Sequence, residues 1–271
     1  MSFRVELPQT FTQRVTELGE GEYLAGMWVC SGSPAAAEIA AASGMQWVLI
    51  DAEHSPIGLE TTTALLRAMN GYPATPVVRV PVNDQVLIKQ YLDLGAQNLL
   101  VPMIDTPADA EAAVRSVYYP PRGVRGVGSA LARASRWNAV PNYLARAEEL
   151  VSLTVQIESA TAVDNAAEIA AVDGIDAVFV GPSDLAASMG LLGQQTHPDV
   201  TDAVLRTFDA VKAAGKLVGV NAFDPEQARK YLDAGASFVL VGADVGLMMN
   251  GARAWAETWV RDPTAEQQQS S

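Results

Sequence analysis

The 271-residue chain has a single cysteine, Cys30, and so cannot form an intrachain disulfide. We interpret Cys30 as a small buried residue on a strand rather than as a nucleophile. The N-terminus has no basic segment followed by an apolar one, and no apolar run reaches the length of a transmembrane helix. We therefore expect neither a secretion signal nor a membrane span, and the cytoplasm is the default location.

Positive charge is also scarce. Eighteen Lys and Arg residues oppose 31 Asp and Glu residues, giving a net charge of −13. This balance argues against nucleic acid or an anionic membrane as a partner, although a bound metal or a local arginine still permits an anionic substrate. The hydrophobic share of 49% allows a large core, and the segments are too periodic for a disordered chain.

The most informative stretch covers residues 151–190. Two apolar runs, V-S-L-T-V-Q-I-E and D-A-V-F-V-G-P-S-D, are typical of strands buried on both faces, and they lead to Glu158 and Asp184. Apolar residues at helical spacing separate them: Val163, Ala166, Ala167 and Ala170. This strand–helix–strand unit puts both carboxylates at neighbouring carboxyl ends of a parallel sheet, where α/β folds bind ligands. Since the carboxylates would repel each other, a divalent metal between them is the simplest prediction.

Strands and helices alternate along the whole chain. An N-terminal helix is expected over 8–20, and a last helix over 245–260. Besides the two runs above, strands are expected over 23–29, 47–51, 76–80, 98–104, 217–222 and 238–241. The pattern predicts a single (β/α)8 barrel over residues 1–271, with a short polar C-terminal tail, T-A-E-Q-Q-Q-S-S, that is expected to be frayed.

One internal echo accompanies this alternation. Y-L-D-L-G-A-Q-N-L-L-V begins at Tyr91, and Y-L-D-A-G-A-S-F-V-L-V begins at Tyr231, four strand–helix units later. Two half-barrels would give this offset. A glycine that ends a helix before a strand would give the same local pattern without any duplication. Both interpretations stay open.

The segment between Tyr118 and Ser152 is longer than an ordinary barrel connection. Its first part carries Arg122, Arg125, Arg133 and Arg136. The segment is either a solvated basic loop or a lid or subunit contact that brings positive charge to an acidic molecule. We favour the second interpretation, because Trp137 and the small residues around it indicate packing.

Further chemistry follows the second predicted strand, in I-D-A-E-H-S-P. Asp51, Glu53 and His54 should face the same mouth as the two carboxylates above, and a histidine there is as readily catalytic as structural. His197 precedes a predicted helix start and is interpreted as a surface or capping residue. Arg79, inside the apolar run P-V-V-R-V-P, needs an anionic partner, which is either a ligand or a structural carboxylate.

Five motifs give the chain a family resemblance: L-I-D-A-E-H, P-V-V-R, Y-P-P-R-G-V-R-G-V-G-S-A-L-A-R-A-S-R-W-N, V-Q-I-E and G-P-S-D-L. They extend over nearly the whole chain and resemble the metal-dependent (class II) pyruvate aldolases of the HpcH/HpaI type, most of all the 4-hydroxy-2-oxoheptane-1,7-dioate aldolases. The resemblance implies a TIM barrel of the phosphoenolpyruvate/pyruvate-binding type. It also implies a homohexamer built from dimers that exchange the last helix. Ala52 departs from the usual Gly, and the region of Phe223 and Asp224 matches less well, which leaves the aldehyde open.

The resemblance also implies roles for single residues. Glu158 and Asp184 would ligate a divalent metal. Carboxylate oxygens are suitable ligands for Mg²⁺, Mn²⁺ or Co²⁺. The implied catalytic group comprises the base His54, the enolate stabiliser Arg79, and two supporting carboxylates, Asp51 and Asp93. Asp93 would raise the basicity of a histidine, although its echo at Asp233 indicates a structural role. The implied substrate site comprises Arg79, Gln156, Gly181, Pro182, Ser183 and Asp184.

These residues predict a carbon–carbon lyase that reversibly cleaves a 4-hydroxy-2-oxo acid to pyruvate and an aldehyde through a metal-stabilised pyruvate enolate. No lysine lies at a strand end in this set, which argues against a Schiff-base aldolase. One alternative is a citrate-lyase-like enzyme that acts on an acyl-CoA thioester, and another is a barrel that binds an oxo acid without catalysis. The resemblance places the reaction in the catabolism of aromatic compounds. The aldehyde, the metal and the stereochemistry at C4 stay open.

Overall fold

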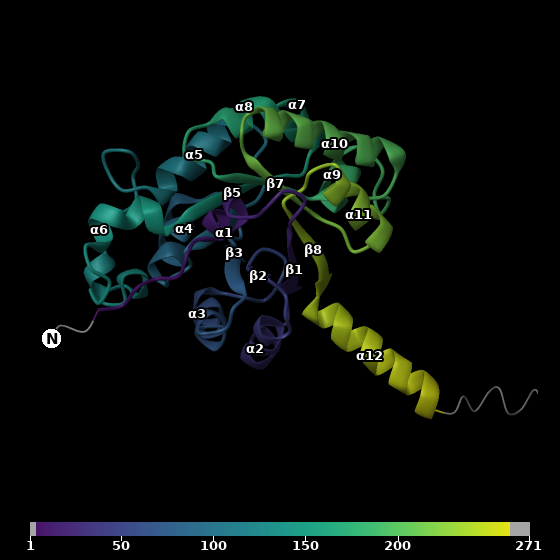
Figure 1. The fold of residues 1–271 in the computed structure, drawn as a ribbon, viewed down its shortest axis with the longest axis horizontal. Helices are drawn as coiled ribbons and strands as arrows, with labels where there is room; N and C mark the ends of the chain where they lie inside the picture. The colour runs from purple at the N-terminus through teal and green to yellow at the C-terminus, as the bar shows by residue number, and fades with distance from the viewer. Residues whose placement is uncertain (1–3, 261–271) are drawn as a thin grey trace, which may run out of the picture.

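The computed structural model describes residues 4–260, which form a closed barrel of eight parallel strands surrounded by helices (Figure 1). The strands pair in chain order, and the last pairs with the first. They are β1 (Leu24–Val29), β2 (Trp47–Asp51), β3 (Thr75–Arg79), β4 (Asn98–Val101), β5 (Ser152–Ile157), β6 (Ala177–Val180), β7 (Leu217–Asn221) and β8 (Phe238–Ala243). The predicted (β/α)8 barrel is confirmed, whereas the tail predicted to be frayed lies outside the described residues.

Helices cover the outside of this barrel. Those that follow the strands are α2 (Pro34–Ala42), α3 (Leu59–Ala68), α4 (Gln85–Asp93), α5 (Pro107–Val117), α7 (Ala160–Asp164), α8 (Ala166–Ala171), α9 (Pro182–Ser188), α10 (Pro198–Ala213), α11 (Pro225–Asp233) and α12 (Asp244–Trp259). His197 is the N-cap of α10 and its Nδ1 accepts a hydrogen bond from the Asp199 N–H, as its predicted capping role requires. The helix predicted between β5 and β6 is broken at Asn165, so Ala167 is exposed and Ile169 packs inward.

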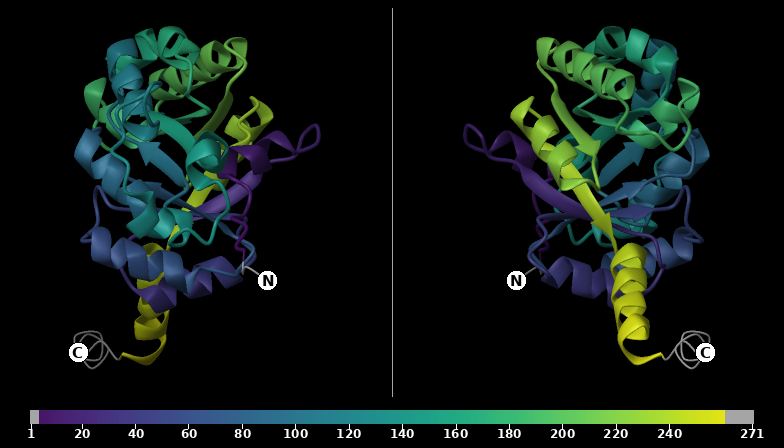
Figure 2. Two further views of the ribbon diagram at one scale, coloured as in Figure 1. Left: turned by 90° about the vertical axis from the view of Figure 1, so that its left-hand side faces the viewer. Right: turned by 90° about the vertical axis from the view of Figure 1, so that its right-hand side faces the viewer.

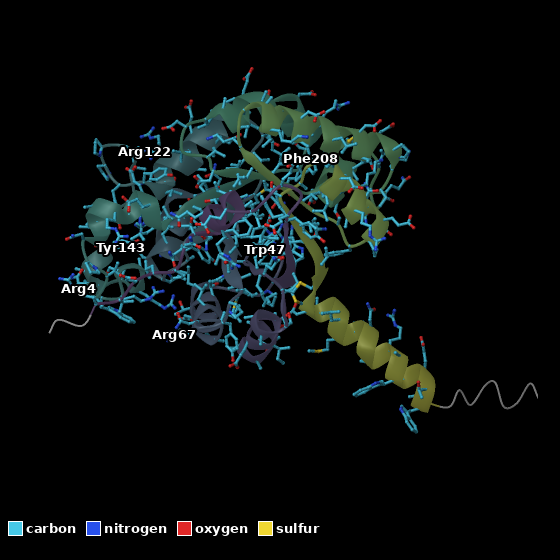
Figure 3. All side chains as sticks on the ribbon, viewed as in Figure 1. Arg4, Trp47, Arg67, Arg122, Tyr143 and Phe208 are labelled. Atoms are coloured by element: carbon cyan, nitrogen blue, oxygen red, sulfur yellow. The ribbon has the colours of Figure 1, made fainter. Side chains whose placement is uncertain are left out.

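The amino end of the barrel is closed by α1 (Phe11–Thr16), which is shorter than the predicted helix over 8–20. The Thr10 side chain accepts from the Gln13 N–H and the Gln13 side chain accepts from the Thr10 N–H, so the helix starts at a capping box. The Phe11 N–H donates to Asn98 Oδ1 at 2.7 Å, and its ring lies 4.9 Å from that of Trp47. Trp47 itself lies in the middle of the barrel (Figure 3). With this end filled by aromatic rings, ligands have access to the opposite, carboxyl end.

α12 projects away from the barrel, as the two side views also show (Figure 2). Its apolar side chains are exposed along its length: Leu247, Met248, Met249, Trp255 and Trp259. Among the helices that the structure describes, none combines the length and apolar character needed to cross a membrane.

The arginine-bearing segment between α5 and β5 lies at the amino end of the barrel, because it leaves the end of a helix and enters the start of a strand. It contains α6 (Tyr143–Arg146) and the 3₁₀ turns η1 (Ser129–Leu131), η2 (Arg133–Ser135) and η3 (Ala147–Leu150). The prediction that it forms a lid is wrong for the site of its own chain, since it lies at the end opposite the strands' carboxyl ends. Arg122 forms ion pairs with Glu148 and Asp173.

Candidate active site

The carboxyl ends of the strands surround a cavity of about 260 Å³ that collects most of the predicted site residues. Its lining includes Asp51, His54, Arg79, Gln156, Gly181, Pro182, Ser183 and Asp184, together with Trp28, Cys30, Phe179, Asn221, Phe223 and Ala243. Glu158 directly follows β5 and lies against Gly181 and Gln156. The closed barrel therefore brings together residues from the ends of seven strands, all but β4.

Arg79, the last residue of β3, is buried among carboxylates. Its Nε donates to Asp51 Oδ1 at 2.9 Å, and its Nη1 lies 3.0 Å from Glu53 Oε2 as an ion pair without hydrogen-bond alignment. The guanidinium also stacks 4.4 Å from the centroid of the Trp28 ring. Burial by itself raises the pKa of Asp51, but the hydrogen bond and the charge of Arg79 outweigh it and hold that pKa below its ordinary value. The anion that Arg79 was predicted to need is thus supplied by structural carboxylates.

Glu158 is a buried carboxylate with no cation to neutralise it among the described residues. Its Oε1 accepts a hydrogen bond from the Met103 N–H at 2.7 Å, and its Oε2 accepts one from Gln156 Nε2 at 2.5 Å. Met103 has a left-handed backbone conformation, with a φ of 56°, which turns its N–H toward Glu158. Burial is the main cause that raises the pKa of Glu158 to about 7, and the charges of Glu53 and Asp184 add to the effect. The ionised form is therefore poorly stabilised by the protein alone.

Gly181 joins β6 to α9, and the first turn of α9 carries Pro182, Ser183 and Asp184. A Cβ atom on Gly181 would lie 3.0 Å from Gln156 Nε2 and 3.3 Å from the Glu158 carboxylate, so a larger residue would push this group apart. Pro182 opens α9, and no side chain in the described part of the chain caps it. Ser183 and Asp184 both line the cavity, so their uncapped backbone N–H groups are available to an anionic ligand there.

His54 lies at the rim of the cavity, with 63% of its side chain exposed. Its Nε2 is 3.8 Å from Glu53 Oε1, so a carboxylate stands beside the imidazole. Burial is the main cause that raises the pKa of Glu53, against the opposing charge of Arg79. The local acid beside His54 is therefore Glu53, which the sequence singled out without giving it a role.

Asp93 is not part of this group. It is the last residue of α4, at the amino end of the barrel, and its Oδ1 accepts from Arg125 Nη2 at 2.8 Å. Arg125 is 1% exposed and the Asp93 side chain 26%, so this is a partly buried structural pair. Within one chain Asp93 lies at the amino end of the barrel and His54 at the carboxyl end, so Asp93 does not lie beside this histidine, and its implied support of a histidine stays a prediction.

Sequence reasoning missed part of the cavity wall. The Trp28 indole N–H donates to Asn221 Oδ1 at 2.8 Å, which joins β1 to the end of β7. A polar residue at the end of an apolar strand was a signal that could have identified Asn221. Cys30, expected to be buried on a strand, instead follows β1, is partly exposed and lines the cavity.

The carboxylates fit a divalent cation. Among the described residues no cluster of three or more His, Cys, Asp or Glu side chains could hold a metal, so a closed protein cage is not present there. Glu158 and Asp184 instead form a two-carboxylate set, and the neighbouring Gln156 Oε1 is buried without a hydrogen-bond partner in the described structure. Excess negative charge and an unpaired acceptor fit a hard cation, which this set of ligands would leave accessible to water and substrate.

The raised pKa of Glu158 predicts a pH effect on the protein without metal. Between about pH 4.5, its ordinary pKa, and pH 7, the folded chain holds a proton on Glu158 that the unfolded chain has released. Stability should therefore fall as the pH rises through this window, while affinity for the cation should increase. In Glu158→Gln the thermal unfolding midpoint, measured against pH, should lack the part of its decrease that Glu158 causes in this window. Asp202→Asn, at an exposed position of α10, is the matched control and should keep it; an unchanged profile in Glu158→Gln would contradict the assignment.

Known proteins share this sequence and this architecture. The sequence profile of the family described as HpcH/HpaI aldolase/citrate lyase matches residues 24–251. A hydroxypyruvate/pyruvate aldolase from Deinococcus radiodurans is 50% identical over 250 residues, which cover 92% of this chain and 90% of that protein. A 4-hydroxy-2-oxo-heptane-1,7-dioate aldolase from Salmonella heidelberg is 48% identical over 231 residues, which cover 85% of this chain and 88% of the relative. The crystal structure of an HpcH/HpaI aldolase/citrate lyase family protein from Burkholderia cenocepacia J2315 matches with a TM-score of 0.86 at 42% identity, over 91% of this chain and 97% of that one.

Proposed function

Because the chain belongs to the HpcH/HpaI aldolase/citrate lyase family and is thus a carbon–carbon lyase of the aldolase type, we propose that it reversibly cleaves a 4-hydroxy-2-oxo acid to pyruvate and an aldehyde. The supporting observation is the juxtaposition of an uncompensated carboxylate pair, Glu158 and Asp184, with the fixed guanidinium of Arg79 at one cavity. The two carboxylates can hold a cation, and the guanidinium can stabilise an anion that forms beside that cation.

The oxo acid binds by its 1-carboxylate and 2-oxo group. The carboxylate receives hydrogen bonds from the backbone N–H groups of Ser183 and Asp184, at the positive start of α9. Gly181 and Pro182 shape this turn, and Gln156 orients Glu158 through its Nε2. Glu158 and Asp184 would hold a divalent cation, which would supply Lewis acidity to the 2-oxo group.

Arg79 stabilises the negative charge that grows on the enolate oxygen. Its Nε and Nη1 face Asp51 and Glu53, and none of the hydrogen bonds among the described residues uses its Nη2. Asp51 acts as a positioning residue, because it holds the guanidinium and is itself held by the backbone N–H groups of Glu53 and His54. These contacts hold the Arg79 guanidinium in place, so it does not have to reorient as negative charge develops on the enolate oxygen.

His54 moves the proton. In the cleavage direction it accepts the proton of the 4-hydroxyl as the C3–C4 bond breaks, which releases the aldehyde and leaves the enolate of pyruvate. The protonated His54 then returns this proton to C3 of the enolate, which gives pyruvate and regenerates the neutral base. Glu53 Oε1 lies 3.8 Å from His54 Nε2, beside the positive charge that this step creates.

The aldehyde occupies the rest of the cavity, where Trp28, Phe179 and Phe223 provide aromatic surface and Asn221 a polar group. Relatives with two different aldolase names match this chain at nearly equal identity, 50% and 48%. We therefore propose to test the synthetic direction with pyruvate and with hydroxypyruvate, each against short polar aldehydes and longer acidic ones. The preferred pair identifies the substrate, and failure of all pairs with every metal would refute the aldolase proposal.

Removal of the metal should abolish this activity. After chelation and dialysis, turnover is expected to fall to the background rate, and addition of Mg²⁺, Mn²⁺ or Co²⁺ should restore it, since two carboxylates leave the cation exchangeable. Circular dichroism before and after chelation controls for unfolding. Full turnover in protein shown by elemental analysis to contain no metal would contradict the proposal, and the ion that restores most activity at equal concentration identifies the preferred cofactor.

We also propose that the protein is a homo-oligomer, with a hexamer as the expected form. Trp255 and Trp259 of α12 are 75% and 81% exposed, and no other element within residues 4–260 packs against this helix beyond its first turns. Apolar surface of this extent is typical of a subunit interface. Light scattering should give a mass several times 28.7 kDa, and Trp255→Lys with Trp259→Lys should lower it. A wild-type protein that stays monomeric at micromolar concentration would contradict this expectation.

A further inference from the structure

A second cavity, of about 310 Å³, lies at the amino end of the barrel, remote from the strand ends that carry Glu158 and Asp184. Thr75 and Pro76 at the start of β3, Asn98 at the start of β4 and the turn that follows α3 form much of its wall. Its volume is within the range of sites for small molecules. The mechanism proposed above does not use it.

Three arginines line this cavity: Arg14, Arg133 and Arg136. The latter two converge, because a Cβ atom on Gly95 would lie 2.5 Å from Arg133 Nη1 and 3.1 Å from Arg136 Nη1. Both side chains are only partly exposed, so the two like charges meet in a partly dry place. Repulsion between them is therefore only weakly screened.

No carboxylate among the described residues offsets these charges. None of the residues that line the cavity is acidic, and none of the three arginines has an ion pair in the described part of the chain. The pKa of Arg133 is lowered to about 10, mainly by burial, and the charges of Arg136 and Arg67 contribute to this shift. Arg67 lies at the end of α3 (Figure 3).

The acceptors that these arginines do have are neutral. Arg133 Nη1 donates to the Leu94 carbonyl at 3.2 Å and Arg136 Nη1 to the Arg133 carbonyl at 2.6 Å. Leu94 is the C-cap of α4, and a helix end is equivalent to roughly half a negative charge. Arg14 Nη1 donates to the carbonyls of Gln46 and Pro73 and to Thr75 Oγ1. These contacts leave most of the positive charge without a counter-charge.

We propose that this cavity binds a small metabolite with a multiply charged oxyanion group, either a phosphate ester or a dicarboxylate, through Arg133 and Arg136. Two guanidinium forks that face one point match the oxygens of such a group, and both ligand types share this chemistry. The apolar part of the wall, from Leu66, Met69 and Tyr72, accommodates the carbon skeleton of the ligand. In a chain with a net charge of −13, an unpaired cluster of this kind is a specific feature.

The test is isothermal titration calorimetry of the full chain, freed of metal, with inorganic phosphate in one arm and succinate in the other. Metal removal prevents either anion from binding through a cation at the candidate active site. At least one anion should bind the wild-type protein, and Arg133→Gln with Arg136→Gln should weaken that binding about tenfold or more. The arm that responds distinguishes the phosphate class from the dicarboxylate class.

A matched control removes the same charge elsewhere, through Arg206→Gln with Arg229→Gln at exposed positions, and should bind like the wild type. Arg133→Lys with Arg136→Lys keeps the charge but not the forks, so it should bind with intermediate strength if the fold is retained by circular dichroism. Three results would overturn the proposal: no binding of either anion to the wild type, equal binding to the Gln variant, or a changed oligomeric mass of that variant. The last would show that these arginines contact another subunit.

Discussion

Replacement of Glu158 by Gln, or of Asp184 by Asn, is expected to lower aldolase turnover by about 10³-fold or more while the fold is retained. Both side chains lie at strand ends around one cavity, and each supplies a charged oxygen to the proposed cation. The neutral amides keep the size of the side chains but not the charge. Because burial already disfavours the ionised form of Glu158, as its raised pKa shows, loss of that charge should not destabilise the barrel.

The control for this prediction is Glu168→Gln, at an exposed position of α8, which removes one carboxylate away from the cavity. It should keep full turnover. Metal content, measured by elemental analysis after dialysis, should fall in both cavity variants and not in the control. Turnover within tenfold of the wild type in Glu158→Gln, together with unchanged metal content, would show that this carboxylate is not a ligand.

Pyruvate alone should exchange its C3 protons for deuterium in D₂O when the protein carries its metal. If Arg79 and the cation stabilise an enolate, removal of a methyl proton requires no aldehyde, and NMR should show the methyl signal decline. A barrel that only binds oxo acids would hold pyruvate without exchange, and an enzyme specific for acyl-CoA thioesters has no reason to enolise free pyruvate. Exchange therefore separates the aldolase mechanism from both alternatives. If no exchange occurs with Mn²⁺ or Co²⁺, the enolate mechanism is wrong.

Variants assign the residues in this exchange. Arg79→Lys keeps a positive charge between Asp51 and Glu53 but loses the planar fork, and should slow exchange by about 10²-fold. Arg79→Ala should slow exchange further. It also leaves Asp51 and Glu53 without their cationic partner, which can disrupt the carboxyl end of the barrel. The circular dichroism of this variant must therefore be compared with that of Arg79→Lys. His54→Ala should slow both exchange and cleavage by about 10²–10⁴-fold. Normal exchange with failed cleavage would instead assign His54 to the 4-hydroxyl proton alone.

The sequence by itself determined the elements and the end of the barrel at which chemistry takes place. Apolar runs that stop at a polar residue identified the strands and placed Asp51, Arg79 and Glu158 at their carboxyl ends. This worked because a strand buried on both faces tolerates few polar residues, so the residues that break the run are those that reach the mouth. Local capping chemistry likewise predicted His197, since an N-cap depends on its immediate neighbours.

Only the tertiary structure decided which partners these residues have. Asp93 pairs with Arg125, and the carboxylate beside His54 is that of Glu53. The Trp28–Asn221 hydrogen bond and the convergence of Arg133 and Arg136 at Gly95 were likewise decided by the tertiary structure. Partner choice, burial and the raised pKa of Glu158 depend on the distances between segments that are far apart in the chain, and those distances are fixed when the barrel closes. The end of the strand at which a residue lies follows from the local periodicity of the sequence. Its charge environment, in contrast, depends on all the neighbours that the fold brings to it.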